Sequence, residues 1–412
     1  MRRVITFLGL NPKLARYEYN GTIYGSATFP EALCRFVAFD CMNVFVTPKA
    51  RADTLPTLLT LGDPRIEPVD IPDGQNSAEM WAIFDALVGV VDDGDTLIFD
   101  ITHTFRSIPF FVFLALAYLK SAYKNVRIER ILYGALTPGD APDPVIDLTE
   151  FIALLDWMSA TDQFVGFGNS QALVQLIRDA ASAGNDAPAD RLKLRQFATS
   201  LDDVSRSLQL AIPDKAMIAS HRLSHHLAQV QEPMQRNLRP FLPLADRVEK
   251  AFAGIALADP RQEENVWRSL ALERQIIAWY LDRQLLLQAL TIAFEWLLSY
   301  GIASLGYNDL YNGETRTKIR NYYTATNRAR RLPPHKLYAR DAENAEKART
   351  VLPKITDHER LLTLYEDVTR LRNDLLHASK TVGEVRSGRT PEQWEDDIRW
   401  VCGQLDSFPL RE

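Results

Sequence analysis

The chain has 412 residues, of which 46% are hydrophobic and 24% are charged, and its formal net charge is −6 at pH 7. This length is typical of two or three domains, and the apolar content is enough for ordinary buried cores. The acidic balance excludes a protein whose whole surface is built for nucleic acid, so any such contact has to be local. The three cysteines (Cys34, Cys41 and Cys402) form no CxxC pair and no zinc spacing, which predicts a reduced, cytoplasmic protein. No uninterrupted apolar stretch reaches the roughly 18 residues of a membrane span, so we expect no membrane partner.

Residues 1–150 alternate between strand and helix signals. Short β-branched or aromatic runs predict strands at Val4–Leu8, Asn43–Thr47, Thr96–Asp100 and Arg130–Gly134. Apolar residues at helical spacing predict helices between them, at Pro30–Asp40, Ala50–Leu61, Ser77–Val91 and Ile108–Tyr123. Such alternation favours a Rossmann-like α/β domain, a mostly parallel sheet with helices on both faces. The first turn, Gly9-Leu10-Asn11-Pro12, lacks the G-x-G-x-x-G pattern, which excludes a dinucleotide dehydrogenase.

The pattern changes around Pro138–Pro144. From Thr149 onward it is almost wholly helical, with apolar residues at helical spacing in Ala189–Leu210, Met217–Val230, Pro243–Ala256, Asn265–Tyr300 and Thr356–Ser379. Thr390 and Pro391 predict the N-cap and first turn of a last helix. We therefore expect an all-α C-terminal region, and we divide the chain into domains 1–160, 161–260 and 261–412.

The first functional motif is the polar run Asp100-Ile101-Thr102-His103-Thr104-Phe105-Arg106-Ser107, which links a predicted strand to a predicted helix. Such a turn lies at the carboxyl edge of a parallel sheet, where ligands bind and helix N-termini favour anions. The run contains no nucleophile–base pair and no metal set, which favours a binding site over a reactive one. The alternatives are that Asp100 only caps the turn, that His103 is structural and that Arg106 pairs with a carboxylate.

The second motif is an Arg-x4-His spacing, Arg372 to His377, on a predicted amphipathic helix. Its buried stripe is Leu364, Val368, Leu371 and Leu375. Residues five apart are offset by about 140° around a helix, so the two motif side chains do not share one face but are able to flank a groove. Histidine moves protons near neutral pH and arginine matches phosphate oxygens, as metal-free RNA cleavage requires. The alternative is that His377 is only a favourable charge near a helix end and that Arg372 is solvated.

A second Arg-x4-His match, Arg330 to His335, contains Pro333-Pro334 and is expected in a loop. It lies within residues 315–340, which contain no Asp or Glu. Basic residues interleaved with tyrosines favour phosphate contact and base stacking, which makes candidate RNA-binding residues of Arg316, Lys318, Arg320, Tyr323, Arg328, Arg330 and Arg331. The alternative is a solvated surface loop. His221, His225 and His226 have no nearby ligand partners, so no metal is expected.

Taken together, the two motifs resemble those of the CARF–HEPN ribonucleases of type III CRISPR systems, in the branch named for a D-x-T-H-G motif. Here the motif ends in Thr104 instead of glycine. Asp147-Leu148-Thr149, Asp156-Trp157 and Phe164 extend the resemblance, whereas the central helices, about 170–260, carry no recognisable motif. The resemblance implies a CARF sensing domain at 1–160, a helical linker at 161–260 and a HEPN ribonuclease domain at 261–412.

The resemblance implies an endoribonuclease that cleaves single-stranded RNA when a cyclic oligoadenylate binds. Cyclic tetra-adenylate is the expected activator and cyclic hexa-adenylate the second choice, and no other cofactor is expected. Arg372, His377 and Asn373 of two protomers would form the catalytic site, so a homodimer or a larger homo-oligomer is implied. The ligand would contact Gly9, Leu10, Asn11, Thr47, Pro48, Thr102, His103, Thr104, Phe105, Arg106, Ser107, Tyr133, Gly134 and Ala135.

Two alternatives remain open on sequence grounds. The chain is a nucleotide sensor without catalysis that recruits a partner, or its N-terminal domain also degrades its own ligand. A DNA-binding regulator is disfavoured because no helix-turn-helix carries a clustered basic face.

Overall fold

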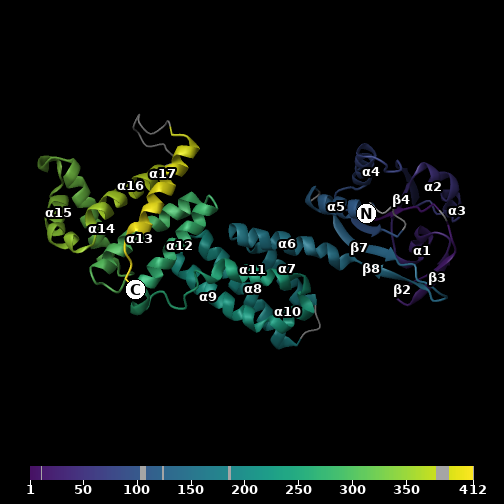
Figure 1. The fold of residues 1–412 in the computed structure, drawn as a ribbon, viewed down its shortest axis with the longest axis horizontal. Helices are drawn as coiled ribbons and strands as arrows, with labels where there is room; N and C mark the ends of the chain where they lie inside the picture. The colour runs from purple at the N-terminus through teal and green to yellow at the C-terminus, as the bar shows by residue number, and fades with distance from the viewer. Residues whose placement is uncertain (11, 103–107, 123–124, 184–186, 377–388, 412) are drawn as a thin grey trace. The chain divides into compact units, whose positions relative to one another are not determined.

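The computed structural model describes the whole chain except residues 11, 103–107, 123–124, 184–186, 377–388 and 412. It contains two compact units, Met1–Asp156 and Trp157–Glu412 (Figure 1). The first unit is an α/β domain and the second is helical, which confirms the predicted fold class. The division of the helical part at residue 260 stays a prediction.

An eight-stranded sheet forms the first unit, in the order β3-β2-β8-β7-β6-β1-β4-β5. The pairs β1–β4, β4–β5, β1–β6, β6–β7 and β2–β8 are parallel, whereas β2–β3 and β7–β8 are antiparallel. The sheet is therefore mostly parallel, as predicted. Its strands are β1 Arg2–Phe7, β2 Ala15–Tyr19, β3 Thr22–Ser26, β4 Cys41–Val46, β5 Ile66–Asp70, β6 Thr96–Asp100, β7 Arg127–Gly134 and β8 Asp143–Asp147.

Helices cover both faces of this sheet because side chains alternate along each buried strand. Val4 and its neighbours on one face pack against α1, α2 and α3. Ile5 and its neighbours on the other face pack against α4 and α5. These helices are α1 Phe29–Phe36, α2 Pro48–Asp53, α3 Leu55–Leu59, α4 Ser77–Gly89 and α5 Ile108–Ala122.

The strand order places a topological switch point beside β1. Apart from the β2–β3 hairpin at the far edge, the chain passes from β1 to β4 and β5 on one side, then returns to β6 and β7 on the other side. In open α/β sheets such a reversal leaves a crevice outside the carboxyl ends of the two central strands. Here those ends are Phe7 of β1 and Asp100 of β6.

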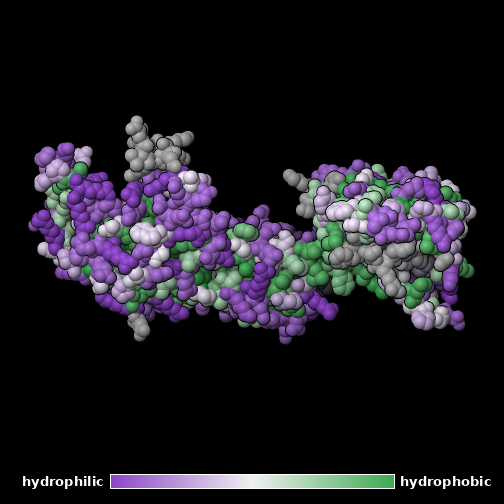
Figure 2. Space-filling model, turned by 45° about the horizontal axis from the view of Figure 1, so that its top comes forward, coloured by the Kyte–Doolittle hydropathy of each residue, from purple (hydrophilic) through white to green (hydrophobic). Residues whose placement is uncertain are grey.

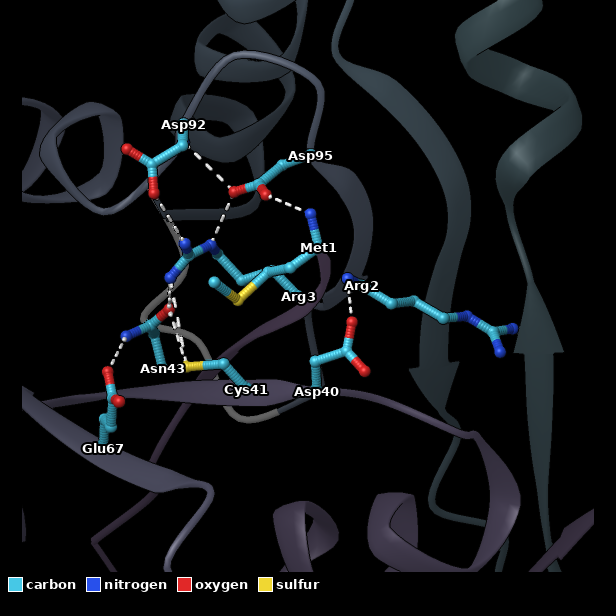
Figure 3. A network of polar contacts seen from close by, with 9 residues as sticks. All are labelled: Met1, Arg2, Arg3, Asp40, Cys41, Asn43, Glu67, Asp92 and Asp95. Atoms are coloured by element: carbon cyan, nitrogen blue, oxygen red, sulfur yellow. Dashed lines mark hydrogen bonds and ion pairs between the residues drawn. The ribbon is translucent and has the colours of Figure 1, made fainter.

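A buried polar network joins the opposite, amino ends of the same strands (Figure 3). Arg3, only 6% exposed, donates through Nε to Asp95 at 2.8 Å and through Nη1 to Asn43 Oδ1 at 2.9 Å. Its Nη2 donates to Asp92 at 3.1 Å, and Asn43 in turn donates to Glu67 at 3.3 Å. One guanidinium therefore ties β1 to β4 and to the turn that precedes β6.

The helical unit begins within α6 and continues through α17. The expected helix Asn265–Tyr300 is instead two helices, because the chain turns at Gln284, whose φ is 57°. Thr390 is the N-cap of the last helix, as predicted, and Gln393 completes a capping box with it. The helices are α6 Thr149–Phe167, α7 Gln171–Ala183, α8 Pro188–Gln209, α9 Pro213–Gln229, α10 Gln231–Asn237, α11 Leu242–Ala253, α12 Val266–Asp282, α13 Leu286–Ser304, α14 Gly313–Arg331, α15 Ala339–Val351, α16 His358–Leu376 and α17 Pro391–Gly403.

Helix α13 is the core of the second half of this unit and packs against α12, α14, α16 and α17. Trp296 at its centre is fully buried and donates its indole N–H to the Leu270 carbonyl at 2.8 Å. By length and composition alone α13 is apolar enough to cross a membrane, but 72% of the relevant window is buried in the protein. It has the burial expected of a core helix in a soluble protein.

We predict that Arg3→Met destabilises the protein by about 1–3 kcal/mol, because the buried Asp95 loses its guanidinium partner and keeps only the Met1 amine and the Asp92 N–H. The measurement is urea-induced unfolding followed by circular dichroism. Arg51→Met is the control, because the Arg51–Asp70 pair is exposed and is expected to contribute little to stability. Equal destabilisation by the two substitutions would contradict the role assigned to Arg3.

Candidate functional site

Asp100 shapes the turn that carries the first motif. Its carboxylate is fully buried and accepts a hydrogen bond from the Thr6 hydroxyl at 2.5 Å and from the Thr102 backbone N–H at 2.7 Å. The first bond joins β6 to β1 at the switch point, and the second folds the chain sharply after the strand. Asp100 therefore has the turn-capping role that the sequence left as an alternative.

Thr102 and Gly134 interlock at the same edge of the sheet. The Gly134 N–H donates to the Thr102 hydroxyl at 2.8 Å. A Cβ atom at Gly134 would lie 3.1 Å from the Thr102 methyl group and 3.1 Å from the Phe29 ring. Glycine is needed here because β7 approaches the turn so closely. Both residues were predicted to contact ligand, and the structure shows that they position the turn.

The other predicted ligand residues lie around the carboxyl ends of the strands. Gly9 and Leu10 follow β1 and are half-buried, while Tyr133 of β7 is 37% exposed. Thr47 is buried, and its hydroxyl accepts from the Ala50 N–H at 3.3 Å as the N-cap of α2. Pro48 is exposed and Ala135 half-buried. Asn11, His103, Thr104, Phe105, Arg106 and Ser107 lie outside the described residues.

A cavity of about 320 Å³ lies at this edge, beside the end of β1. Two buried threonine hydroxyls on its wall, Thr28 and Thr54, have no hydrogen-bond partner among the described residues, although each residue precedes a helix. The exposed Lys13 adds a positive charge. Sequence reasoning missed these residues because it did not predict the β2–β3 hairpin beside them. The lining is Leu8, Gly9, Leu10, Pro12, Lys13, Ala27, Thr28, Thr54 and Leu136.

The second motif begins in the last described turns of α16. The Arg372 guanidinium lies over the Phe294 ring, 5.0 Å from its centre, and its buried Nε has no hydrogen-bond partner in the part of the chain that the structure describes. Phe294 packs on Tyr365, and Tyr365 packs on Tyr323. Arg372 is thus half-buried on an aromatic platform and is not simply solvated. Asn373 is exposed, and His377 lies outside the described residues.

The acid-free segment forms α14 and the connection after it, so it is not one surface loop. Tyr323 is fully buried, which contradicts its predicted role in RNA stacking. The reason is helical spacing: Ile319, Tyr322 and Tyr323 form the core-facing stripe of α14. A Cβ atom at Gly301 of α13 would lie 1.7 Å from the Tyr323 hydroxyl, so the two helices are in close contact there. Tyr338, by contrast, is 76% exposed.

Most of the predicted RNA-binding arginines already hold a carboxylate. Arg328 pairs with Asp341 at 2.7 Å, Arg330 pairs with Glu359, and Arg331 pairs with Glu366. Arg316 is engaged by Glu295, by the Ser299 hydroxyl and by the Leu310 carbonyl. Lys318 and Arg320 are exposed and form no ion pair with a described residue. These two basic side chains are able to bind a phosphate without first releasing a carboxylate.

A groove of about 210 Å³ runs between α14 and α16. It brings together Arg328 and Arg331, which the sequence predicted, with Arg370, which it missed. Arg370 lies one turn before Asn373 on the same helical face, so the groove leads toward the motif. The lining is Thr324, Asn327, Arg328, Arg331, Tyr365, Glu366, Thr369 and Arg370.

Among the described residues, no group of three or more His, Cys, Asp or Glu side chains is placed to bind a metal ion. His225 contacts Gln229, and burial lowers the pKa of His226. The expectation that the protein uses no metal stays a prediction.

Residues 153–255 match the family model described as CRISPR-associated protein MJ1674, second domain. The CRISPR-associated protein MJ1674 of Methanocaldococcus jannaschii is 35% identical to this chain over 113 residues, or 26% of the chain. The predicted resemblance to CRISPR-associated proteins is confirmed. The match spans 17% of that relative's own length.

A solved structure, Enterococcus italicus Csm6 bound to cyclic hexa-2′-fluoro-hexa-dAMP, aligns with a TM-score of 0.42 and 10% identity. The alignment covers 98% of this chain and 94% of that chain. A similarity of this degree establishes neither a ligand nor an activity for this chain.

The matched segment comprises most of α6 and helices α7 to α11. Its start contains Asp156, Trp157 and Phe164, which extended the resemblance in the sequence, whereas the part after about residue 170 carries no recognised motif. Gly168, between α6 and α7, has a φ of 67°, and a Cβ atom there would lie 2.9 Å from the Trp279 ring, so the backbone approaches α12 closely at this turn.

We predict that Gly134→Ala destabilises the protein by about 1–3 kcal/mol, because the added methyl group displaces Thr102 or Phe29. Thermal or urea unfolding measures this change. Gly25→Ala in β3 is the control, since the nearest atom to its new methyl group is 3.9 Å away. If the Gly134 variant is as stable as the unchanged protein, the close packing of Gly134 against Thr102 and Phe29 is contradicted.

Proposed function

We propose that the protein is an endoribonuclease of type III CRISPR defence that cleaves single-stranded RNA when a cyclic oligoadenylate binds its N-terminal unit. The proposed mechanism uses no metal: the RNA 2′-hydroxyl attacks the adjacent phosphate and leaves a 2′,3′-cyclic phosphate. The proposed location is the cytoplasm.

The observation that carries the proposal is the environment of Arg372. Its guanidinium is partly buried on the Phe294 ring, which restrains it, and its Nε has no acceptor among the described residues. An arginine held in this way, with donors left for a ligand, suits a phosphate at a reaction centre. In the proposed site Arg372 stabilises the scissile phosphate, His377 transfers protons and Asn373 positions the substrate.

The groove between α14 and α16 is the proposed path of the RNA. Its arginines pair with carboxylates such as Glu366 and Asp341, and phosphates are able to replace these partners. The end of the helical unit that carries α14 and α15 is largely hydrophilic (Figure 2). Lys318, Arg320 and the exposed Tyr338 extend this surface, with the tyrosine available for base stacking.

The carboxyl edge of the sheet is the proposed activator site. It combines the switch point, the start of α5 and a cavity whose Thr28 and Thr54 hydroxyls have no partner within the described ranges. Such an edge offers backbone N–H groups and a helix N-terminus to phosphates. Cyclic tetra-adenylate is the proposed ligand, with cyclic hexa-adenylate as the second choice.

We propose that the active form is a homodimer, because a symmetric ligand suits an interface formed by two copies of one surface. Large apolar side chains are exposed on the N-terminal unit, including Trp81 at 62% and Tyr118 at 51%. They join through Phe84 into an aromatic cluster on α4 and α5. Exposed apolar patches of this kind are typical of interaction surfaces.

We predict that His377→Ala lowers activator-dependent RNA cleavage at least 10²-fold, because the proposed proton transfer loses its group. Cleavage of a labelled single-stranded RNA measures the rate, and calorimetry measures activator binding, which is expected to remain. His335→Ala is the matched control, since it alters the other Arg-x4-His spacing, whose histidine follows the end of α14 at Arg331. Full cleavage by the His377 variant would remove it from the site.

The same assay separates the alternatives. A protein that binds the ring but never cleaves RNA is a sensor that recruits a partner, and loss of the ring during incubation identifies a sensing domain that degrades its ligand. Comparison of tri-, tetra- and hexa-adenylate rings identifies the activator.

We predict that Arg106→Ala raises the dissociation constant of the activator about tenfold or more, because a charged hydrogen bond to phosphate is lost. Isothermal titration calorimetry measures the constant. Arg127→Ala is the control: Arg127 is exposed at the start of β7, at the opposite edge of the sheet. Equal affinities of the Arg106 variant and the unchanged protein would exclude Arg106 from the site.

A further inference from the structure

A second cavity, about 250 Å³ in volume, lies within the helical unit and belongs to neither proposed site. The cavity has exposed residues, Glu295 and Tyr311, on one side. Asp214, Glu273 and Ser299 on its wall are buried. Helices α9, α12, α13 and α14 all contribute to its wall. The lining is Ala211, Pro213, Asp214, Glu273, Thr291, Ile292, Glu295, Ser299, Leu310, Tyr311 and Arg316.

Two of the three carboxylates in this cavity are paired with arginines. Asp214 accepts from Arg261 Nη2 at 2.7 Å and from Arg261 Nε at 3.1 Å. Glu295 accepts from Arg316 Nη2 at 2.5 Å. These arginines are themselves fixed, Arg261 over the Tyr311 ring and Arg316 by Ser299 and Leu310. Neither arginine is therefore available to form an ion pair with the third carboxylate.

Glu273 is that third carboxylate. It is 7% exposed on α12 and forms no hydrogen bond or ion pair with a described residue, although it lines the cavity. A buried carboxyl group without a partner is costly, and a protein normally satisfies such a group with a donor. The empty space beside Glu273 is the place from which a donor is able to come.

The wall of the cavity decides what kind of donor fits. Three carboxylates and a single arginine, Arg316, line the cavity, which disfavours an anion. The described carboxylates are not arranged as a group of three metal ligands, which disfavours a metal ion. Ile292, Leu310 and the Tyr311 ring supply apolar walls, and the Ser299 hydroxyl supplies a further polar contact. We propose that this cavity binds a small organic cation with N–H donors, an amine or a guanidine, whose charged group pairs with Glu273.

Binding of such a cation is expected to release a proton. Burial raises the pKa of Glu273 to about 8, with Arg316 opposing the shift and Asp214 and Glu295 adding to it, so the free group is mostly protonated at pH 7. An ammonium group pairs with the carboxylate form, and the carboxyl proton passes to the solvent. Since the pKa of Glu273 is raised, affinity is expected to increase up to about pH 8 and then to level off.

Calorimetry on the full chain tests the proposal, with putrescine and agmatine as probes in two pH 7 buffers of different ionisation enthalpy. We expect binding of at least one probe with release of up to one proton per cation. Tetramethylammonium, which has no N–H donor, is expected to bind at least tenfold more weakly. Glu273→Gln is expected to weaken binding at least tenfold and to abolish proton release. The exposed Glu343→Gln, which alters the Lys347 pair, is expected to change neither.

Thr291→Trp gives an independent test, because it fills the half-exposed rim without touching a carboxylate. It is expected to abolish binding, and it serves as the main test if Glu273→Gln does not fold. The proposal is overturned if neither probe binds, or if the amine binds equally to the Gln or Trp variant. Equal binding of tetramethylammonium would also overturn it. RNA cleavage is no part of this readout, so the result is independent of the proposed ribonuclease activity.

Discussion

The hydrogen bond from Thr6 to the buried Asp100 carboxylate is the constraint on which the N-terminal unit depends. It joins the two strands on either side of the switch point, at the one edge where the sheet is open to a ligand. The same carboxylate accepts a hydrogen bond from the Thr102 N–H, and the Thr102 hydroxyl accepts one from the Gly134 N–H. These hydrogen bonds connect β1, β6 and β7. Arg3 secures the opposite ends of these strands. The turn that follows Asp100 therefore begins from a fixed position.

Much of this fold is visible in the sequence because buried parallel strands are continuous apolar runs. Thr96–Asp100 was predicted with the bounds that the structure has, since it is apolar, short and followed by a polar turn. The β2–β3 hairpin was not predicted, because Arg16 and Glu18 alternate with Tyr17 and Tyr19 and make the segment look polar. Because the hairpin was not predicted, Thr28, which lines part of the cavity at the sheet edge, was not recognised as a candidate site residue.

The candidate sites were predicted less completely than the fold. Composition identified the basic segment, but the face of a helix that each residue occupies decides its role, and Tyr323 falls on the buried face. Charge alone also gave no sign that Arg316 and Arg328 hold carboxylates contributed by other elements. Glu273 looks like any surface glutamate in the sequence, because its isolation results from helices that meet only in three dimensions. Most of the matched segment, residues 153–255, was likewise left without a functional prediction, because the sequence offers no recognised motif after about residue 170.

The close contact of Gly301 with Tyr323 makes α13 and α14 mechanically continuous, since a densely packed contact transmits displacement and does not absorb it. Along α14, Arg316 at the Glu273 cavity and Arg328 at the α14–α16 groove lie about 18 Å apart. A ligand that separated the walls of the first cavity would therefore tilt α14 as a whole. Such a tilt would change the distance across the groove between Arg328 of α14 and Arg370 of α16.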